Sequence, residues 1–107
     1  MIQVDTIADF YFDLNTSDHY EDEVKNYLTN LQGKMTAKEI IRVAEPFKSN
    51  VGLTSRVTVR LILKLEESRE CRHIDDYAGK VFPFLKKHLK GELITTRNTT
   101  FKYIRAS

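Results

Sequence analysis

The chain has 107 residues, of which 41% are apolar and 30% are charged. This length and composition are typical of one folded domain with a modest core, and they exclude a disordered chain. No apolar run is long enough to span a membrane, and a single cysteine, Cys71, excludes an internal disulfide. We expect a single intracellular domain over residues 1–107, in the cytoplasm, nucleoid or nucleus, with no membrane partner.

The net charge of +2 is unevenly distributed along the chain. Residues 1–24 contain seven acidic residues and no Lys or Arg, whereas residues 25–107 have a net charge of +9. A basic body suggests a polyanion as partner. A solvated surface of mixed charge explains the same composition almost as well.

The acidic N-terminal segment, residues 1–17, begins without the basic residues of a signal peptide, so we interpret it as part of the folded domain. It contains several large apolar side chains, among them Ile7, Phe10, Phe12 and Leu14. Leaving them in water is unfavourable by about 1.5–3 kcal/mol each. Residues 1–16 should therefore pack against the domain, in the core or as a strand. A partner-binding strip of Phe10, Tyr11 and Phe12 is the alternative.

The clearest predicted helix covers residues 18–32. Asp18 is a suitable N-cap with Glu21 three residues later, and Gly33 is a suitable stop. Its apolar positions recur at helical spacing: Tyr20, Val24, Tyr27, Leu28 and Leu31.

A second predicted helix begins at Thr36. Thr36 and Glu39 have the spacing of a capping box, and Pro46 ends or kinks the helix. Its buried face would consist of Ala37, Ile40, Ile41 and Ala44.

Residues 54–67 allow two interpretations. Counted by twos, Val57, Val59, Leu61, Leu63 and Leu65 lie on one side, which is typical of a half-buried strand. Counted by threes and fours, Thr58, Leu61, Ile62 and Leu65 form a helical stripe. The β-branched residues favour a strand, whereas the order of the predicted elements favours a helix.

The last third is mixed. Residues 75–91 form either a hairpin or a helix that begins at Asp75 or Asp76 and is kinked at Pro83. Residues 92–105 are rich in Thr and aromatic residues, which indicates β structure.

The order of these segments resembles the winged helix-turn-helix family over about residues 18–75. Thr36-Ala37-Lys38-Glu39-Ile40 is similar to the start of that family's second helix, and Leu53-Thr54-Ser55-Arg56 to the start of its third. Leu61, Ile62, Leu65, Glu66 and Glu67 are similar to the third helix's stripe and end. The resemblance implies an α+β domain with a three-helix core over 18–69. A wing or C-terminal β-hairpin over 70–107, with room for an extra helix, would follow, and 54–67 would be a helix.

The resemblance implies a transcriptional regulator that binds double-stranded DNA as a homodimer. Ser55, Arg56 and Arg60 would lie near the major groove, where Arg can donate two hydrogen bonds to guanine. Lys64, Arg97 and Lys102 would contact phosphates.

The alternative is a protein-interaction module on a winged-helix or other α+β scaffold, without DNA. In that interpretation Val59 and Leu63 form an exposed apolar face that binds a protein partner. We expect no enzyme and no cofactor, because no catalytic motif is present. Cys71, His73, Asp75 and His88 lack zinc-site spacing, so no metal is expected either.

Overall fold

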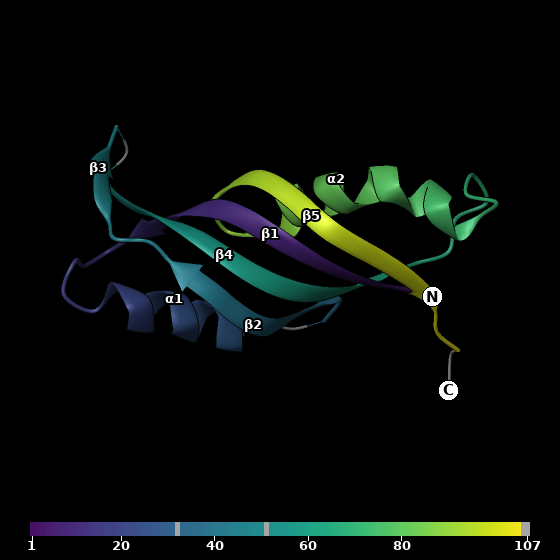
Figure 1. Cartoon of the computed structure of the whole chain (residues 1–107), viewed down its shortest axis with the longest axis horizontal. Helices are drawn as coiled ribbons and strands as arrows, with labels where there is room; N and C mark the ends of the chain where they lie inside the picture. Colours follow the sequence, from purple (N-terminus) through teal and green to yellow (C-terminus); the bar gives the residue numbers. More distant parts are fainter. Residues whose placement is uncertain (32, 51, 106–107) are drawn as a thin grey trace.

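The computed structural model describes residues 1–31, 33–50 and 52–105. Its elements follow the chain as β1 (Ile2–Leu14), α1 (Tyr20–Thr29), β2 (Met35–Val43), β3 (Phe47–Ser49), β4 (Gly52–Leu65), the 3-10 turn η1 (Ile74–Tyr77), α2 (Ala78–His88) and β5 (Glu92–Tyr103). The strands pair antiparallel in one sheet, in the order β2-β4-β1-β5, and β3 pairs with β4 (Figure 1).

Strand β4 lies between β1 and β2, although it follows both of them in the chain. Apart from the short β3, the elements run β-α-β-β-α-β. This is the split β-α-β, or ferredoxin-like, topology. Such a topology occurs with many unrelated functions, so the function has to be argued from side chains.

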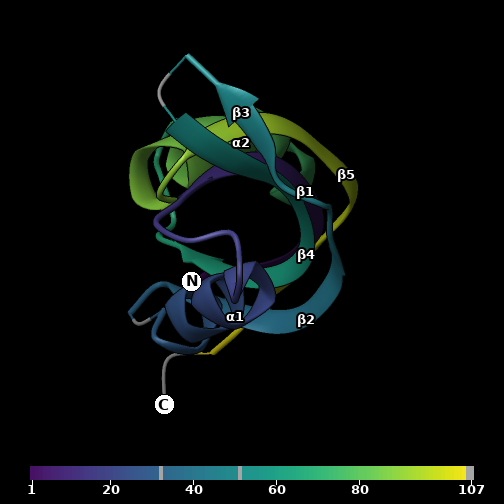
Figure 2. The same cartoon turned by 90° about the vertical axis from the view of Figure 1, so that its left-hand side faces the viewer.

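Both helices lie on the same side of the curved sheet (Figure 2). Beneath them, alternate residues of β4 are buried: Val57, Val59, Leu61, Leu63 and Leu65. Strand β1 buries its even-numbered residues in the same core, and the helices add Val24, Leu28, Val81 and Leu85. We call the opposite side of the sheet the open face. It carries the odd-numbered residues of β1, the even-numbered residues of β4 and the residues of β2 and β5 that pair with them.

The predicted helix over 54–67 is wrong, because this segment is the strand β4. Every residue from Leu53 to Leu65 pairs with one of β1, from Leu14 back to Ile2. This long ladder buries the alternating apolar side of β4, which a helix would spread around its circumference. Val59 and Leu63 are 0% exposed, so they do not form the exposed protein-binding face that we expected.

The second predicted helix is also wrong, because residues 35–43 form the edge strand β2. The capping box of Thr36 and Glu39 offers about 1 kcal/mol of local stabilisation. Pairing with β4 gives the segment backbone hydrogen bonds along one edge over most of its length, and Ile40, Ile41 and Val43 suit a strand. The three-helix winged-helix core is therefore absent.

The expected C-terminal hairpin is wrong as well. Residues 92–103 form a single strand, β5, whose partner is β1. The β character of this segment is confirmed, but its pairing is with the other end of the chain. For residues 75–91, the helical alternative is confirmed by η1 and α2, with Pro83 inside α2.

Two further predictions are confirmed. The helix expected over 18–32 is α1, although it begins at Tyr20 with His19 as N-cap instead of Asp18. The N-terminal segment packs as β1 and buries Phe10, Phe12 and Leu14. Residue 32 of that predicted helix, residue 51 and residues 106–107 of the expected wing lie outside the described residues.

Candidate functional site

A hollow of about 550 Å³ lies on the open face, and we call it the arginine hollow. The residues that line it come from β1, β2, β4 and β5 and from the position just after β2: Asp9, Ile41, Arg42, Ala44, Arg56, Thr58 and Arg97. The strand register makes Thr58 the partner of both Arg42 and Asp9. Three guanidinium groups and one carboxylate are thus gathered from distant parts of the chain.

Asp9 is the buried centre of this hollow, with a side chain only 4% exposed. Its carboxylate accepts hydrogen bonds from the hydroxyls of Thr58 and Thr95 and from the guanidinium of Arg97. Burial alone would raise the pKa of Asp9, but these hydrogen bonds and the charge of Arg97 outweigh it and lower the pKa below its ordinary value. Asp9 is therefore suited to holding Arg97 and not to donating a proton.

A β-bulge in β5 directs Arg97 toward Asp9. Ile7 pairs with Arg97 and Asp5 with Thr100, so two residues of β5 stand opposite Thr6 alone. One of them, Asn98, has a left-handed φ of 53°, which Asn tolerates better than most residues. The Thr6 hydroxyl donates to the Arg97 carbonyl oxygen. The bulge changes the alternation of β5, so that Arg97 and Lys102 both belong to the open face.

The arginines of the open face differ in how far they are neutralised. Arg60 binds Asp5 with two hydrogen bonds, from Nε at 2.8 Å and from Nη2 at 2.6 Å. The hydrogen bond from Arg60 and its charge lower the pKa of Asp5. Within residues 1–31, 33–50 and 52–105, no carboxylate lies within 4.0 Å of Arg42 or Arg56. These two cations are available to an anion.

The residues predicted to contact DNA separate clearly in the structure. Ser55 is fully buried and donates to the carbonyl oxygen of Ala44 at 2.6 Å, so it is not a surface contact. The other five lie on the open face: Arg56, Arg60, Lys64, Arg97 and Lys102. Arg42 is not among the predicted contacts, because the capping pattern at Thr36 and Glu39 predicts a helix for its segment. The β-branched residues Ile40, Ile41 and Val43 were the available signal.

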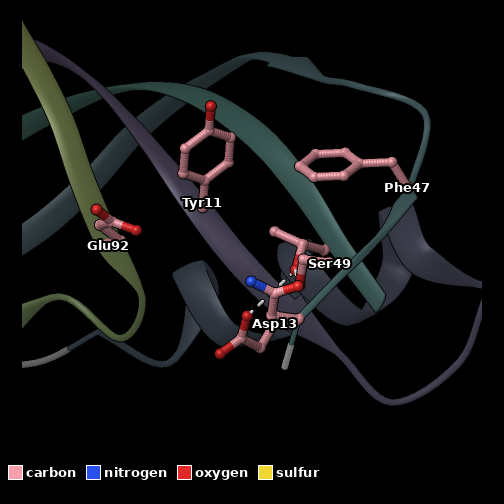
Figure 3. Close-up of a pocket in the computed structure, with 7 residues that line it drawn as sticks. Tyr11, Asp13, Phe47, Ser49 and Glu92 are labelled. Carbon is pink, nitrogen blue, oxygen red and sulfur yellow. Dashed lines mark hydrogen bonds between the residues drawn. The ribbon is translucent and has the colours of Figure 1, made fainter. Parts of the chain in front are cut away.

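A second hollow, of about 570 Å³, lies at the end of the open face beside the β3–β4 hairpin, and we call it the aromatic hollow. It is lined by Tyr11, Asp13, Phe47, Ser49, Asn50, Thr54 and Glu92. The rings of Tyr11 and Phe47 are 5.9 Å apart and nearly perpendicular, at 80°. Figure 3 shows both rings at this hollow, with the Glu92 carboxylate beside Tyr11. The Thr54 hydroxyl donates to Asp13 at 3.4 Å.

The two hollows adjoin each other. Tyr11 follows Asp9 by two residues on β1, so both side chains leave the same face about 7 Å apart. Tyr11 pairs with Arg56 of the arginine hollow on one side and with Glu92 on the other. A cationic hollow and an aromatic hollow with carboxylates thus form one continuous surface.

The segment around Cys71 and His73 is held by Asp76, whose carboxylate accepts hydrogen bonds from the backbone N–H groups of Arg72 and His73. In the part of the chain that the structure describes, no three His, Cys, Asp or Glu side chains are grouped as a metal ion would require. In the same residues, no helix is long and apolar enough to cross a membrane.

Comparison of the chain with protein-family models, with curated proteins and with solved structures finds no match. The winged helix-turn-helix resemblance has no support from these comparisons.

Proposed function

We propose that the open face binds single-stranded nucleic acid, with the phosphates in the arginine hollow and bases in the aromatic hollow. The observation that carries this proposal is the gathering of Arg42, Arg56 and Arg97 beside an aromatic hollow. Guanidinium groups suit phosphate because their planar donors can bind two of its oxygens at once.

The composition of the neighbouring surface supports a strand of nucleic acid over an isolated anion. Lys64 and Lys102 are exposed on the same face, at the end away from Tyr11. They extend the basic surface along the sheet from the arginine hollow. Proteins that bind single strands combine such a basic track with aromatic side chains on which bases stack.

A recognition helix over residues 54–67 would imply duplex DNA as the partner, but this segment is the strand β4. Within the open face, aromatic contacts require unpaired bases, because paired bases stack on one another and hide their faces. We therefore expect single strands to bind more tightly than a duplex of the same sequence. This binding role requires no catalytic step.

The test is fluorescence anisotropy with labelled DNA and RNA strands of about ten nucleotides, and with the matching duplexes, at several salt concentrations. Arg42→Ala and Arg56→Ala should each weaken binding and reduce the log–log salt slope by about 0.7, the value for one contact to a single strand.

The matched control is Arg69→Ala. Arg69 is an exposed arginine in the segment after β4, at the opposite end of that strand from the two hollows. It should leave affinity and slope unchanged. If wild-type protein binds neither DNA nor RNA strands at low salt, the proposal is wrong. Equal losses of affinity for Arg69→Ala and Arg56→Ala would show that the strand binds to positive charge in general and not to the arginine hollow.

A further inference from the structure

We infer that the aromatic hollow selects bases that present an amino group, and that it binds cytosine in preference to uracil or thymine. This inference rests on the proposed function, since the hollow would receive its base from a strand held in the arginine hollow. It goes further by naming the chemical feature that is recognised.

The rings provide the stacking surface. Phe47 is 45% exposed and Tyr11 is partly exposed, so neither ring is consumed by the core. Because the rings are nearly perpendicular, a planar base that stacks on one of them meets the other with its edge. The volume of about 570 Å³ lies within the range of small-ligand pockets.

The carboxylates provide the discrimination. Asp13 and Glu92 present oxygen acceptors at the edge of the hollow. Cytosine carries an amino donor at N4, whereas thymine and uracil carry a carbonyl oxygen at the same position. A carboxylate accepts a hydrogen bond from the amino group and repels the carbonyl oxygen. The two pyrimidines have the same ring size, so stacking hardly distinguishes them.

The neighbouring arginine argues against a different occupant. Aromatic rings with carboxylates also suit organic cations such as quaternary ammonium groups. Here Arg56, the pairing partner of Tyr11, places a positive charge beside the hollow. This charge disfavours a cation and favours a neutral ring that is attached to a phosphate. The base is therefore the better match.

The experiment compares oligocytidine with oligouridine of equal length, and the corresponding DNA strands, by anisotropy at neutral pH. We expect wild-type protein to bind the cytosine strands at least about fivefold more tightly. In Glu92→Gln and Asp13→Asn the side-chain amide can donate to the uracil oxygen, so the preference should shrink, most in the variant whose carboxylate makes the contact. Tyr11→Ala should weaken the binding of both strands, whereas Tyr11→Phe should keep the stacking and the preference for cytosine.

Further measurements distinguish a failure of this inference from a failure of the proposed function. Equal binding of cytosine and uracil strands, with Arg42→Ala still weakening both, would overturn the inference and leave the proposed function standing. If neither strand binds at low salt, both fail. Perturbation of the Tyr11 and Phe47 proton signals by tetramethylammonium but not by cytidine would also overturn the inference. Thermal melts of each variant check that it is folded. If Tyr11→Ala does not fold, the two conservative amide variants still test the preference.

Discussion

The guanidinium of Arg97 on β5 forms an ion pair with the buried carboxylate of Asp9 on β1. The Asp9 side chain is 4% exposed and the Arg97 side chain 49%. The pair thus connects the interior of the sheet to the surface that we propose binds phosphate. Because Asp9 also accepts from Thr58 and Thr95, it joins three strands at one point.

Replacing Asp9 with Ala should destabilise the protein by about 1–3 kcal/mol, because the buried Thr58 hydroxyl loses its acceptor. Urea unfolding measures this loss. The control is Asp18→Ala in the exposed loop before α1, where a change within about 0.5 kcal/mol is expected. Similar losses for both variants would contradict a special role of Asp9.

The stability should decrease in acid, and Asp9 should contribute to the decrease. Burial raises the pKa of Asp9, but its hydrogen bonds and the charge of Arg97 lower the pKa by more than burial raises it. The pKa of Asp9 in the folded protein therefore lies below the ordinary value. Such a carboxylate stabilises the fold above its unfolded pKa, near 3.9, and this stability is lost as the pH falls through the folded pKa. The difference in unfolding free energy between wild type and Asp9→Asn should therefore shrink from about pH 6 to about pH 3. A constant difference across urea titrations in this range would disprove the linkage.

Leu63 and Lys64 are neighbours in β4 with opposite surroundings, since Leu63 is fully buried and Lys64 is exposed. Leu63→Ala should cost about 2–5 kcal/mol of stability. Lys64→Ala should change it by less than about 0.5 kcal/mol. Thermal or urea unfolding of both variants tests the alternation, and comparable effects would argue against a strand.

Arg60 and Arg56 should contribute unequally to nucleic-acid binding. Arg60 is already neutralised by Asp5, whereas no described carboxylate lies within ion-pair distance of Arg56. We expect Arg56→Ala to weaken binding of a single strand several times more than Arg60→Ala. The stability change for Arg60→Ala should be small, about 0–1 kcal/mol, because this pair is partly exposed. Anisotropy titrations decide, and a larger binding loss for Arg60→Ala would contradict the assignment.

Gly91 and Gly79 should respond oppositely to replacement by Ala. Gly91 has a φ of 104°, and a Cβ there would overlap the backbone oxygen of Tyr11. Gly91→Ala should therefore destabilise the protein by at least about 1–3 kcal/mol. Gly79 lies in α2 with open space around it, so Gly79→Ala should be stabilising by about 0.5–1 kcal/mol. Melting temperatures that both fall would contradict the prediction for Gly79, and melting temperatures that both rise would contradict the prediction for Gly91.

Local patterns in the sequence determined several elements correctly. The apolar face of residues 18–32 predicted α1, and the Thr-rich aromatic pattern of 92–105 predicted β5. The apolar residues of the N-terminal segment predicted its packing as β1. The alternation within residues 57–65 already separated Arg60 and Lys64 from the apolar side, which is how β4 presents them.

Only the tertiary structure decided between helix and strand for residues 35–43 and 52–65. Capping signals at Thr36 and Glu39 are local and weak, and the ladder between β2 and β4 overrides them. Strand β4 is itself held by β1, about fifty residues away in the chain. The candidate site depends on the same long-range register. Arg42, Asp9 and Arg97 meet because Thr58 pairs with the first two and a bulge at Asn98 orients the third. Local sequence patterns do not specify which strands will pair or where a bulge will form.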